Sequence, residues 1–107
     1  MVEQAFISAA KSGQLCELTD HAGNIRQVEP YMVYRSGLDK RLFHCFQISG
    51  YSESGHPIGW KNLEVSSFRV GSVADGAFRQ RPQYNPRNAS KFPTIYFALQ
   101  KTSGSAA

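Results

Sequence analysis

Cations and aromatic rings alternate along most of this sequence, and their types and spacing suit the binding of nucleic acid. The set comprises Tyr31, Tyr34, Arg35, Tyr51, Trp60, Lys61, Arg69, Arg79, Arg81, Tyr84 and Arg87. Single-stranded nucleic acid is bound by such sets, because bases stack on rings and phosphates bind arginine or lysine. The same rings can instead pack a sheet, which is the commoner use of tyrosine in strands. Arg26 likewise has a second reading, an ion pair with Glu29 or Glu17 across a ladder.

Positive charge is concentrated in the second half of the chain. Residues 1–53 hold five Lys/Arg and six Asp/Glu, a net of −1, whereas residues 54–107 hold seven and two, a net of +5. A basic half attracts phosphate-bearing or otherwise anionic partners. The alternative is a solvated surface that only keeps the domain soluble.

Residues suited to catalysis or metal binding are sparse. His21, His44 and His56 are far apart and show no metal-ligand spacing. Cys45 follows His44 directly, so within a strand their side chains point to opposite faces and cannot form a nucleophilic pair. Neither a G-x-S-x-G turn nor a phosphate-binding glycine loop is present. We therefore expect no enzyme activity, no catalytic residue, no metal site and no cofactor.

One helix and five or six short strands are expected to position the basic and aromatic residues. Apolar spacing predicts a helix over residues 2–12 that docks Phe6 onto the sheet. Strands are expected at 15–19, 25–34, 42–49, 60–65, 68–71 and 94–100. Pro30 interrupts the second of these and marks an edge or a bulge, because proline cannot donate to a ladder. The fold class is therefore mainly β with one N-terminal helix.

Alternation predicts which way the strand side chains face. Strand 42–49 has apolar residues on both faces, with His44 on one and Cys45 on the other, so we expect a central strand covered on both sides. Trp60 falls on the face opposite Leu63 and Val65. Residues 79–91, rich in proline and arginine, are expected to form a loop over the surface.

Length and composition indicate one domain. A chain of 107 residues is long enough to bury a core without disulfides. We expect a single domain over residues 1–101, a flexible tail at 102–107, and buried free thiols at Cys16 and Cys45. No leader sequence or stretch of membrane-spanning length is recognisable, so a cytoplasmic protein without a membrane partner is expected.

Three segments of the sequence resemble the WYL-domain family. Arg26-Gln27-Val28-Glu29-Pro30-Tyr31 fits the family's R-x-V-x-P motif. Arg41-Leu42-Phe43 stands in place of the name tripeptide, and Lys61-Asn62-Leu63-Glu64-Val65 in place of the basic strand. The resemblance spans residues 4 to 80. The tripeptide itself is absent, and the family's late basic residue falls near Ser67, so the chain looks like a divergent, stand-alone member.

The resemblance implies an SH3-like or Sm-like small β-barrel with a sensing function. Such domains, usually attached to bacterial helix-turn-helix regulators, are thought to bind single-stranded nucleic acid or nucleotides and to act on transcription. The implied partners are such a ligand and a separate DNA-binding regulator. The expected ligand-binding residues are Arg26, Tyr34, Trp60, Lys61 and Arg69, with Trp60 as a stacking surface for a base.

A protein–protein interaction module is the alternative from a different functional class. Small barrels leave edge strands that can pair with a second chain, and Pro30 marks one candidate edge. In a homodimer or a partner-binding barrel of this kind, Trp60 would anchor an interface and would not stack on a base.

Overall fold

The computed structural model describes residues 2–53, 55–88 and 91–101 of the chain. The expected tail at 102–107 lies outside these residues. The elements in chain order are α1 (Val2–Lys11), β1 (Gln14–Asp20), β2 (Ile25–Arg35), β3 (Arg41–Gly50), β4 (Gly59–Glu64), the short 3-10 helix η1 (Val65–Ser67), β5 (Phe68–Ala77) and β6 (Thr94–Ala98). The mainly β class with one N-terminal helix is thus confirmed. No helix within the described ranges is long and apolar enough to cross a membrane.

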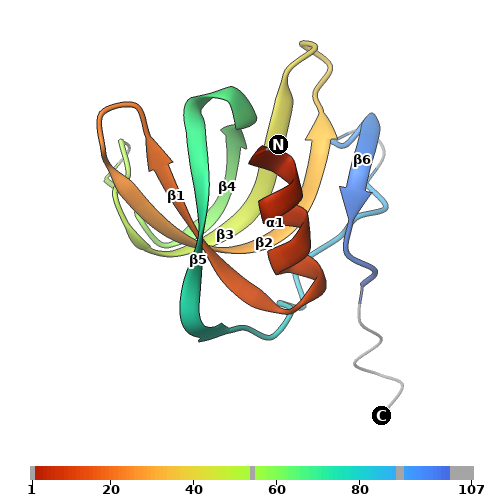
Figure 1. The fold of residues 1–107 in the computed structure, drawn as a ribbon. Coiled ribbons are helices and arrows are strands. Elements are labelled where there is room, and N and C mark those ends of the chain that lie inside the picture. The colour runs from red at the N-terminus through yellow and green to blue at the C-terminus, as the bar shows by residue number, and fades with distance from the viewer. Residues whose placement is uncertain (1, 54, 89–90, 102–107) are drawn as a thin grey trace.

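β2 lies at the centre of an antiparallel sheet of six strands (Figure 1). Five of them follow the order β4-β3-β2-β1-β5, and the sixth, β6, also pairs with β2. β3 pairs along one side of β2, while β1 pairs with residues 25–28 and β6 with residues 32–35 on the other side. Among the described residues no ladder joins the end strands β4 and β5, so the sheet is open.

Pro30 marks a bulge within β2 and not an outer edge of the sheet. The ladder with β3 shifts register between Pro30 and Met32, which leaves Tyr31 as the bulged residue. Pro30 also falls between the last residue that pairs with β1 and the first that pairs with β6. On the side of β2 where β1 and β6 pair, the stretch around Pro30 has no strand partner, so the missing N–H of proline breaks no ladder there. Tyr31 is thereby turned onto the same side as its neighbours Glu29 and Met32.

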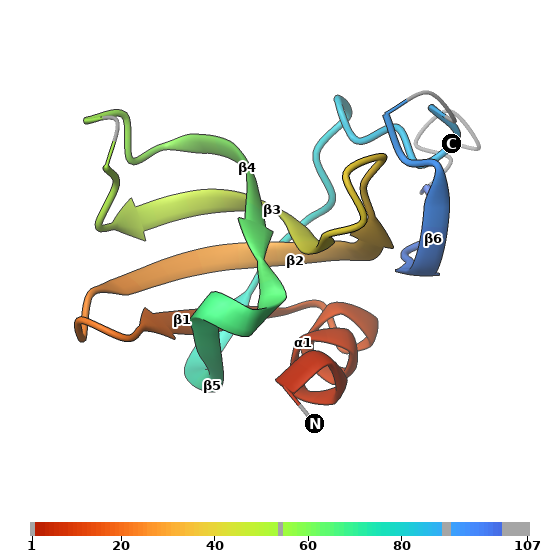
Figure 2. The same cartoon turned by 90° about the horizontal axis from the view of Figure 1, so that it is seen from above.

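The helix covers one face of the sheet, as the phenylalanine near its start predicted (Figure 2). Phe6 is fully buried and stacks on Phe43 of β3, with ring centroids 4.2 Å apart. This first core also contains Cys16, Leu18, Val28, Val33, Cys45, Val65 and Phe68. A buried phenylalanine contributes about 2–3 kcal/mol to the free energy of unfolding, which fixes a helix too short to be stable alone.

A long irregular segment covers the opposite face. We call residues 78–88 and 91–101 the covering segment, which ends in β6 and its continuation. It inserts Tyr84 and Phe92 against Tyr31, Met32 and Tyr34 of β2 to form a second core. Figure 2 shows α1 and this segment on opposite sides of the sheet. The prediction that β3 is covered on both faces is therefore confirmed, and the loop expected at 79–91 has a structural role.

Glu29 and Arg81 fasten the covering segment to β2. Arg81 donates from Nε to one carboxylate oxygen and from NH2 to the other, each at 2.9 Å. The Tyr31 hydroxyl donates to Glu29 at 3.0 Å and accepts from the backbone N–H of Arg81 at 2.9 Å. The interpretation that Glu29 pairs with Arg26 is wrong, because its partner lies 52 residues further along the chain. A tertiary contact across that distance carries no local sequence signal.

Candidate anion-binding site

The five predicted site residues do not lie together. Arg26 and Lys61 lie on the face of the first core. Lys61 pairs with the buried Cys45 across the ladder of β3 and β4, and paired residues share a face. Arg26 lies two residues before the buried Val28 in β2, so these two side chains also share a face. Burial raises the pKa of the Cys45 thiol, and the positive charges of Arg26 and Lys61 both oppose this rise. Tyr34 and Trp60 belong to the second core, on the opposite face. Arg69 lies on β5 and is exposed.

Arg26 is a buried guanidinium with an unpartnered donor. The residue is only 6% exposed. NH1 donates to Oε1 of Gln47 at 3.2 Å, whereas Nε has no hydrogen-bond partner. The rings of Tyr51 and Phe68 lie 5.6 and 5.5 Å from its central carbon. Two aromatic faces and one amide stabilise the cation but do not neutralise it.

Gln47 and Lys61 extend this polar group toward the segment between β3 and β4. Gln47 is fully buried and donates from Nε2 to the backbone carbonyl of Tyr51 at 2.8 Å. Lys61 donates from Nζ to the backbone carbonyl of His56 at 2.7 Å and to Ser52 Oγ at 3.4 Å. We call Arg26, Gln47, Tyr51, Lys61 and Phe68 together the Arg26 site.

The Arg26 site carries two positive charges without a carboxylate partner. The four ion pairs found among the described residues include neither Arg26 nor Lys61. Burial acts to raise the pKa of Asp20, but hydrogen bonds from Asn24 and Ala22 lower it below its usual value, and the charge of Arg26 adds to this lowering. The oxygens of Asp20 are used by its own turn. A buried charge without a counter-ion is costly, so the site favours an anion.

Tyr34 and Trp60 are engaged inside the molecule. The Tyr34 hydroxyl donates to Asn62 Oδ1 at 3.0 Å, and the residue is 4% exposed. The Trp60 ring packs between His44 and the rings of Tyr31 and Phe46. The prediction that Trp60 faces away from the first core is confirmed, and Tyr84 of the covering segment lies over it. Its ring surface is therefore used within the fold.

Arg69 occupies a separate surface. It lies opposite Thr19 in the ladder between β1 and β5 and lines a cavity of about 470 Å³ together with the turn 19–23. Its strand neighbour Phe68 points into the first core, so alternation sends the Arg69 side chain outward. This arginine contributes charge to the outer surface and not to the Arg26 site.

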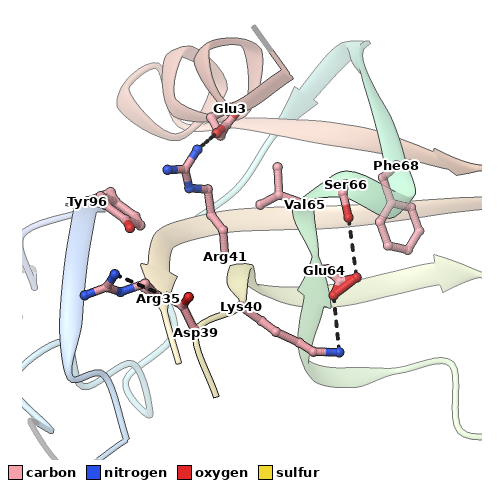
Figure 3. A pocket seen from close by; sticks show the side chains of 10 residues that line it. All are labelled: Glu3, Arg35, Asp39, Lys40, Arg41, Glu64, Val65, Ser66, Phe68 and Tyr96. Atoms are coloured by element: carbon pink, nitrogen blue, oxygen red, sulfur yellow. Dashed lines mark hydrogen bonds and ion pairs between the residues drawn. The ribbon is translucent and has the colours of Figure 1, made fainter. Parts of the chain in front are cut away.

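A second charged region lies at the far end of β2 and β3, and its cations are already paired. A pocket there has a volume of about 670 Å³. It is lined by Glu3, Arg35, Asp39, Lys40, Arg41, Glu64, Val65, Ser66, Phe68 and Tyr96 (Figure 3). Arg41 binds Glu3 at 2.6 Å, Arg35 binds Asp39 at 3.2 Å and Lys40 binds Glu64 at 3.5 Å. The balance of charge makes this pocket a weaker attractor of anions than the Arg26 site.

Sequence reasoning missed Gln47 and did not assign Tyr51 to the site. Gln47 is an ordinary polar residue on a strand, and only the fold shows that it is fully buried beside Arg26. Tyr51 belongs to the basic and aromatic set, but nothing local indicated that the chain turns back at Gly50 to bring its ring over Arg26. Among the described residues, no group of three or more histidine, cysteine or acidic residues is placed to hold a metal ion.

The expected state of the cysteines is confirmed. Cys16 and Cys45 are both buried free thiols in the first core. His44 belongs to the second-core face, packed on Trp60, so the adjacent His44 and Cys45 do lie on opposite faces. Comparison of the chain with protein-family models, with curated proteins and with solved structures gives no match.

Proposed function

We propose that this protein binds an anionic ligand, single-stranded nucleic acid or a nucleotide, and that Arg26 and Lys61 bind its phosphate. The observation that carries the proposal is the buried guanidinium of Arg26, which has neither a carboxylate partner nor a hydrogen-bond partner for Nε in the part of the chain that the structure describes. A phosphate oxygen accepts charge-assisted hydrogen bonds from arginine and lysine and would neutralise the buried charge. Tyr51, 39% exposed, offers a ring beside the phosphate for a base.

Exposed cations of the covering segment support this proposal at longer range. No acidic residue follows Asp75 in the sequence. Arg79, Arg87 and Lys91 are exposed on the covering segment, whereas its aromatic residues Tyr84 and Phe92 are buried in the second core. Tyr84 and Phe92 therefore serve packing, while the exposed cations of the segment remain available to attract a polyanion.

The resemblance to the WYL-domain family supports the same proposal from the sequence. Arg26 is the first residue of the R-x-V-x-P motif and Lys61 the first of the basic strand. The strand order, with η1 connecting β4 to β5, is compatible with an SH3-like barrel. We further propose a sensing domain without enzyme activity that passes ligand binding to a separate DNA-binding regulator of bacterial transcription, in the cytoplasm.

Titration of a labelled single-stranded DNA or RNA oligomer at two salt concentrations, followed by fluorescence anisotropy, tests the function. Saturable binding that weakens steeply with salt is expected. Lys61→Met should weaken binding about tenfold and reduce the salt slope by about 1. Arg26→Met should weaken it at least as much while lowering the free energy of unfolding by no more than about 1 kcal/mol, because a buried unpaired charge is removed along with its contacts.

Two matched variants separate the site from general charge. Lys40→Met removes an exposed cation that already pairs with Glu64, and Arg69→Met removes an exposed cation of β5. Each should change affinity less than threefold. The proposal fails if the wild-type protein binds no oligomer at low salt, or if all four variants lose the same affinity.

A homodimer remains the competing proposal. Within the described ranges β6 pairs only with β2, so its other edge offers a place for a second chain. Tyr96 is bulged out of that ladder, between Ile95 opposite Tyr34 and Phe97 opposite Val33. A bulge interrupts the regular donors and acceptors that strand pairing needs. Light scattering that gives a monomer mass at the concentrations used for binding would exclude this reading.

A further inference from the structure

Two donors of the Arg26 site, Gln47 Nε2 and Lys61 Nζ, are bound by oxygen atoms of the chain itself. The segment between β3 and β4, described at residues 51–53 and 55–58, supplies these oxygens. The carbonyl of Tyr51 accepts from Gln47 Nε2 at 2.8 Å, and the carbonyl of His56 accepts from Lys61 Nζ at 2.7 Å. Neutral carbonyl oxygens thus bind the cation of Lys61 and the neighbouring amide of Gln47. At Lys61 the carbonyl occupies a position where a phosphate oxygen would bind.

This segment is fastened to the sheet mainly at its first residue. The Tyr51 amide donates to the carbonyl of Ile25 at 3.0 Å. Beyond Ser52 the described residues are exposed up to Ile58, which is 58% exposed. The contact of Lys61 with the His56 carbonyl therefore bridges the site to a part of the segment that buries little surface. Segments with so little burial open at low free-energy cost.

We infer that the part of the segment beyond Tyr51, described at residues 52–53 and 55–58, competes with the ligand for Lys61, and that ligand binding displaces this part from the Arg26 site while Tyr51 keeps its place. The inference rests on the proposed function. A hydrogen bond from lysine to an anion is stronger than one to a neutral carbonyl, and one ammonium group cannot hold both partners in the same direction. The segment thus keeps the donors satisfied in the absence of ligand.

Competition of this kind lowers the apparent affinity. Only the fraction of molecules with the segment displaced can bind, so the apparent Kd exceeds the intrinsic Kd by the inverse of that fraction. Shortening the segment should therefore tighten binding, although it removes residues that lie next to the site. A segment that contributed contacts to the ligand would have the opposite effect.

The test replaces residues 52–57 by Asn-Gly, which shortens the connection between Gly50 and Gly59 without changing the ladder that ends at Gln47 and Gly59, and measures binding of the labelled single-stranded DNA oligomer. Because the replacement also removes Glu53, the reference is the full-length variant Glu53→Gln. The shortened protein should bind about tenfold more tightly than this reference, and Lys61→Met introduced into it should abolish the gain. Circular dichroism and the urea midpoint establish that the shortened chain is folded.

Each outcome decides between the two proposals. Equal or weaker binding by the shortened protein, with the wild type still binding, overturns the competition and leaves the proposed function standing. Absence of binding in both proteins overturns both. Hydrogen exchange on the wild type gives an answer that needs no variant. The Gly55 amide, which donates to the Ser52 carbonyl at 3.3 Å, should exchange faster when the oligomer is bound. Slower exchange would mean that the segment closes over the ligand, and the inference would be wrong.

Discussion

The imidazole of His44 lies parallel to the indole of Trp60, with ring centroids 5.0 Å apart and planes 7° apart. Its Nδ1 lies 2.8 Å from Oδ1 of Asn62, which also accepts from the Tyr34 hydroxyl. Because an amide oxygen only accepts hydrogen bonds, Nδ1 carries the proton of the neutral ring. His44 therefore serves the second core as a neutral, oriented aromatic group.

Stability should fall with acid because of His44. Burial lowers the pKa of His44 below its usual 6.5, the nearby charge of Lys91 lowers it further, and the hydrogen bond to Asn62 opposes the shift. Below about pH 6.5 the unfolded chain binds a proton at this residue that the folded chain does not, so the free energy of unfolding decreases as pH falls. Urea unfolding of the wild type and of His44→Gln between about pH 7.5 and 5.5 measures the effect.

The difference in the free energy of unfolding between the wild type and His44→Gln should shrink toward low pH. His44→Gln lowers stability at pH 7.5 through lost packing, but it removes the acid-dependent loss. The matched control is His21→Gln, which changes an exposed turn residue and should leave the pH dependence as in the wild type. Parallel curves for His44→Gln and the wild type would contradict the prediction.

Breaking the contact between Glu29 and Arg81 should destabilise the protein. Glu29 is 5% exposed, and Arg81→Met would leave its carboxylate with the Tyr31 hydroxyl as its remaining side-chain donor among the described residues. A buried charged group without its partner costs about 2–3 kcal/mol of the free energy of unfolding. The urea midpoint at constant m-value measures it.

Arg35→Met provides the comparison for this pair. Arg35 and Asp39 form an exposed pair with side chains 48% and 81% accessible, and such pairs contribute about 0–1 kcal/mol. Equal losses in the two variants would show that the covering segment does not depend on Arg81.

Gly50 should tolerate no side chain. Its φ is +105°, and a Cβ atom there would lie 2.3 Å from the carbonyl oxygen of Ile25. Gly50→Ala should therefore cost more than the roughly 1–2 kcal/mol of a left-handed backbone alone, because the backbone of β2 would have to move. Gly23→Ala is the control, with φ +87° and open space around the added atom. An equal decrease of the melting temperature in Gly50→Ala and Gly23→Ala, measured by thermal unfolding, would contradict this prediction.

The two cysteines should be unreactive in the folded protein. Burial raises the pKa of the Cys16 thiol to about 12 and that of Cys45 higher still. The thiolate is the reactive form, so a chromogenic disulfide reagent at pH 8 should label neither residue quickly and should label both in denaturant. Fast labelling of one thiol in native conditions would show that the first core opens readily.

Local sequence patterns were sufficient to predict the elements and their faces. Apolar spacing placed the helix and the docking of Phe6, and alternation along β3 separated His44 from Cys45 correctly. Such periods depend on residues close in the chain, because side-chain direction in a strand or helix is set by the local backbone. Most strand ends agree within two residues, whereas β5 extends to Ala77, six residues beyond the expected end.

Only the tertiary structure decided which residues far apart in the sequence contact each other. Pro30 was compatible with an edge or a bulge, and the placement of β1 and β6 on either side of it settled the question. Trp60 was known to face away from the first core, but its cover, Tyr84, comes from a segment without regular strands. Arg81, which binds Glu29, belongs to the same covering segment.

The sequence by itself determined the fold class, the burial of both cysteines and, away from the bulges, the side of the sheet to which strand residues such as His44, Cys45 and Trp60 point. The tertiary structure alone decided that Arg26 is buried without a carboxylate partner while Glu29 is held by Arg81. The physical reason is that periodicity reports which face a side chain takes, whereas the ion pairs and uncompensated charges of a site depend on which distant segment covers that face.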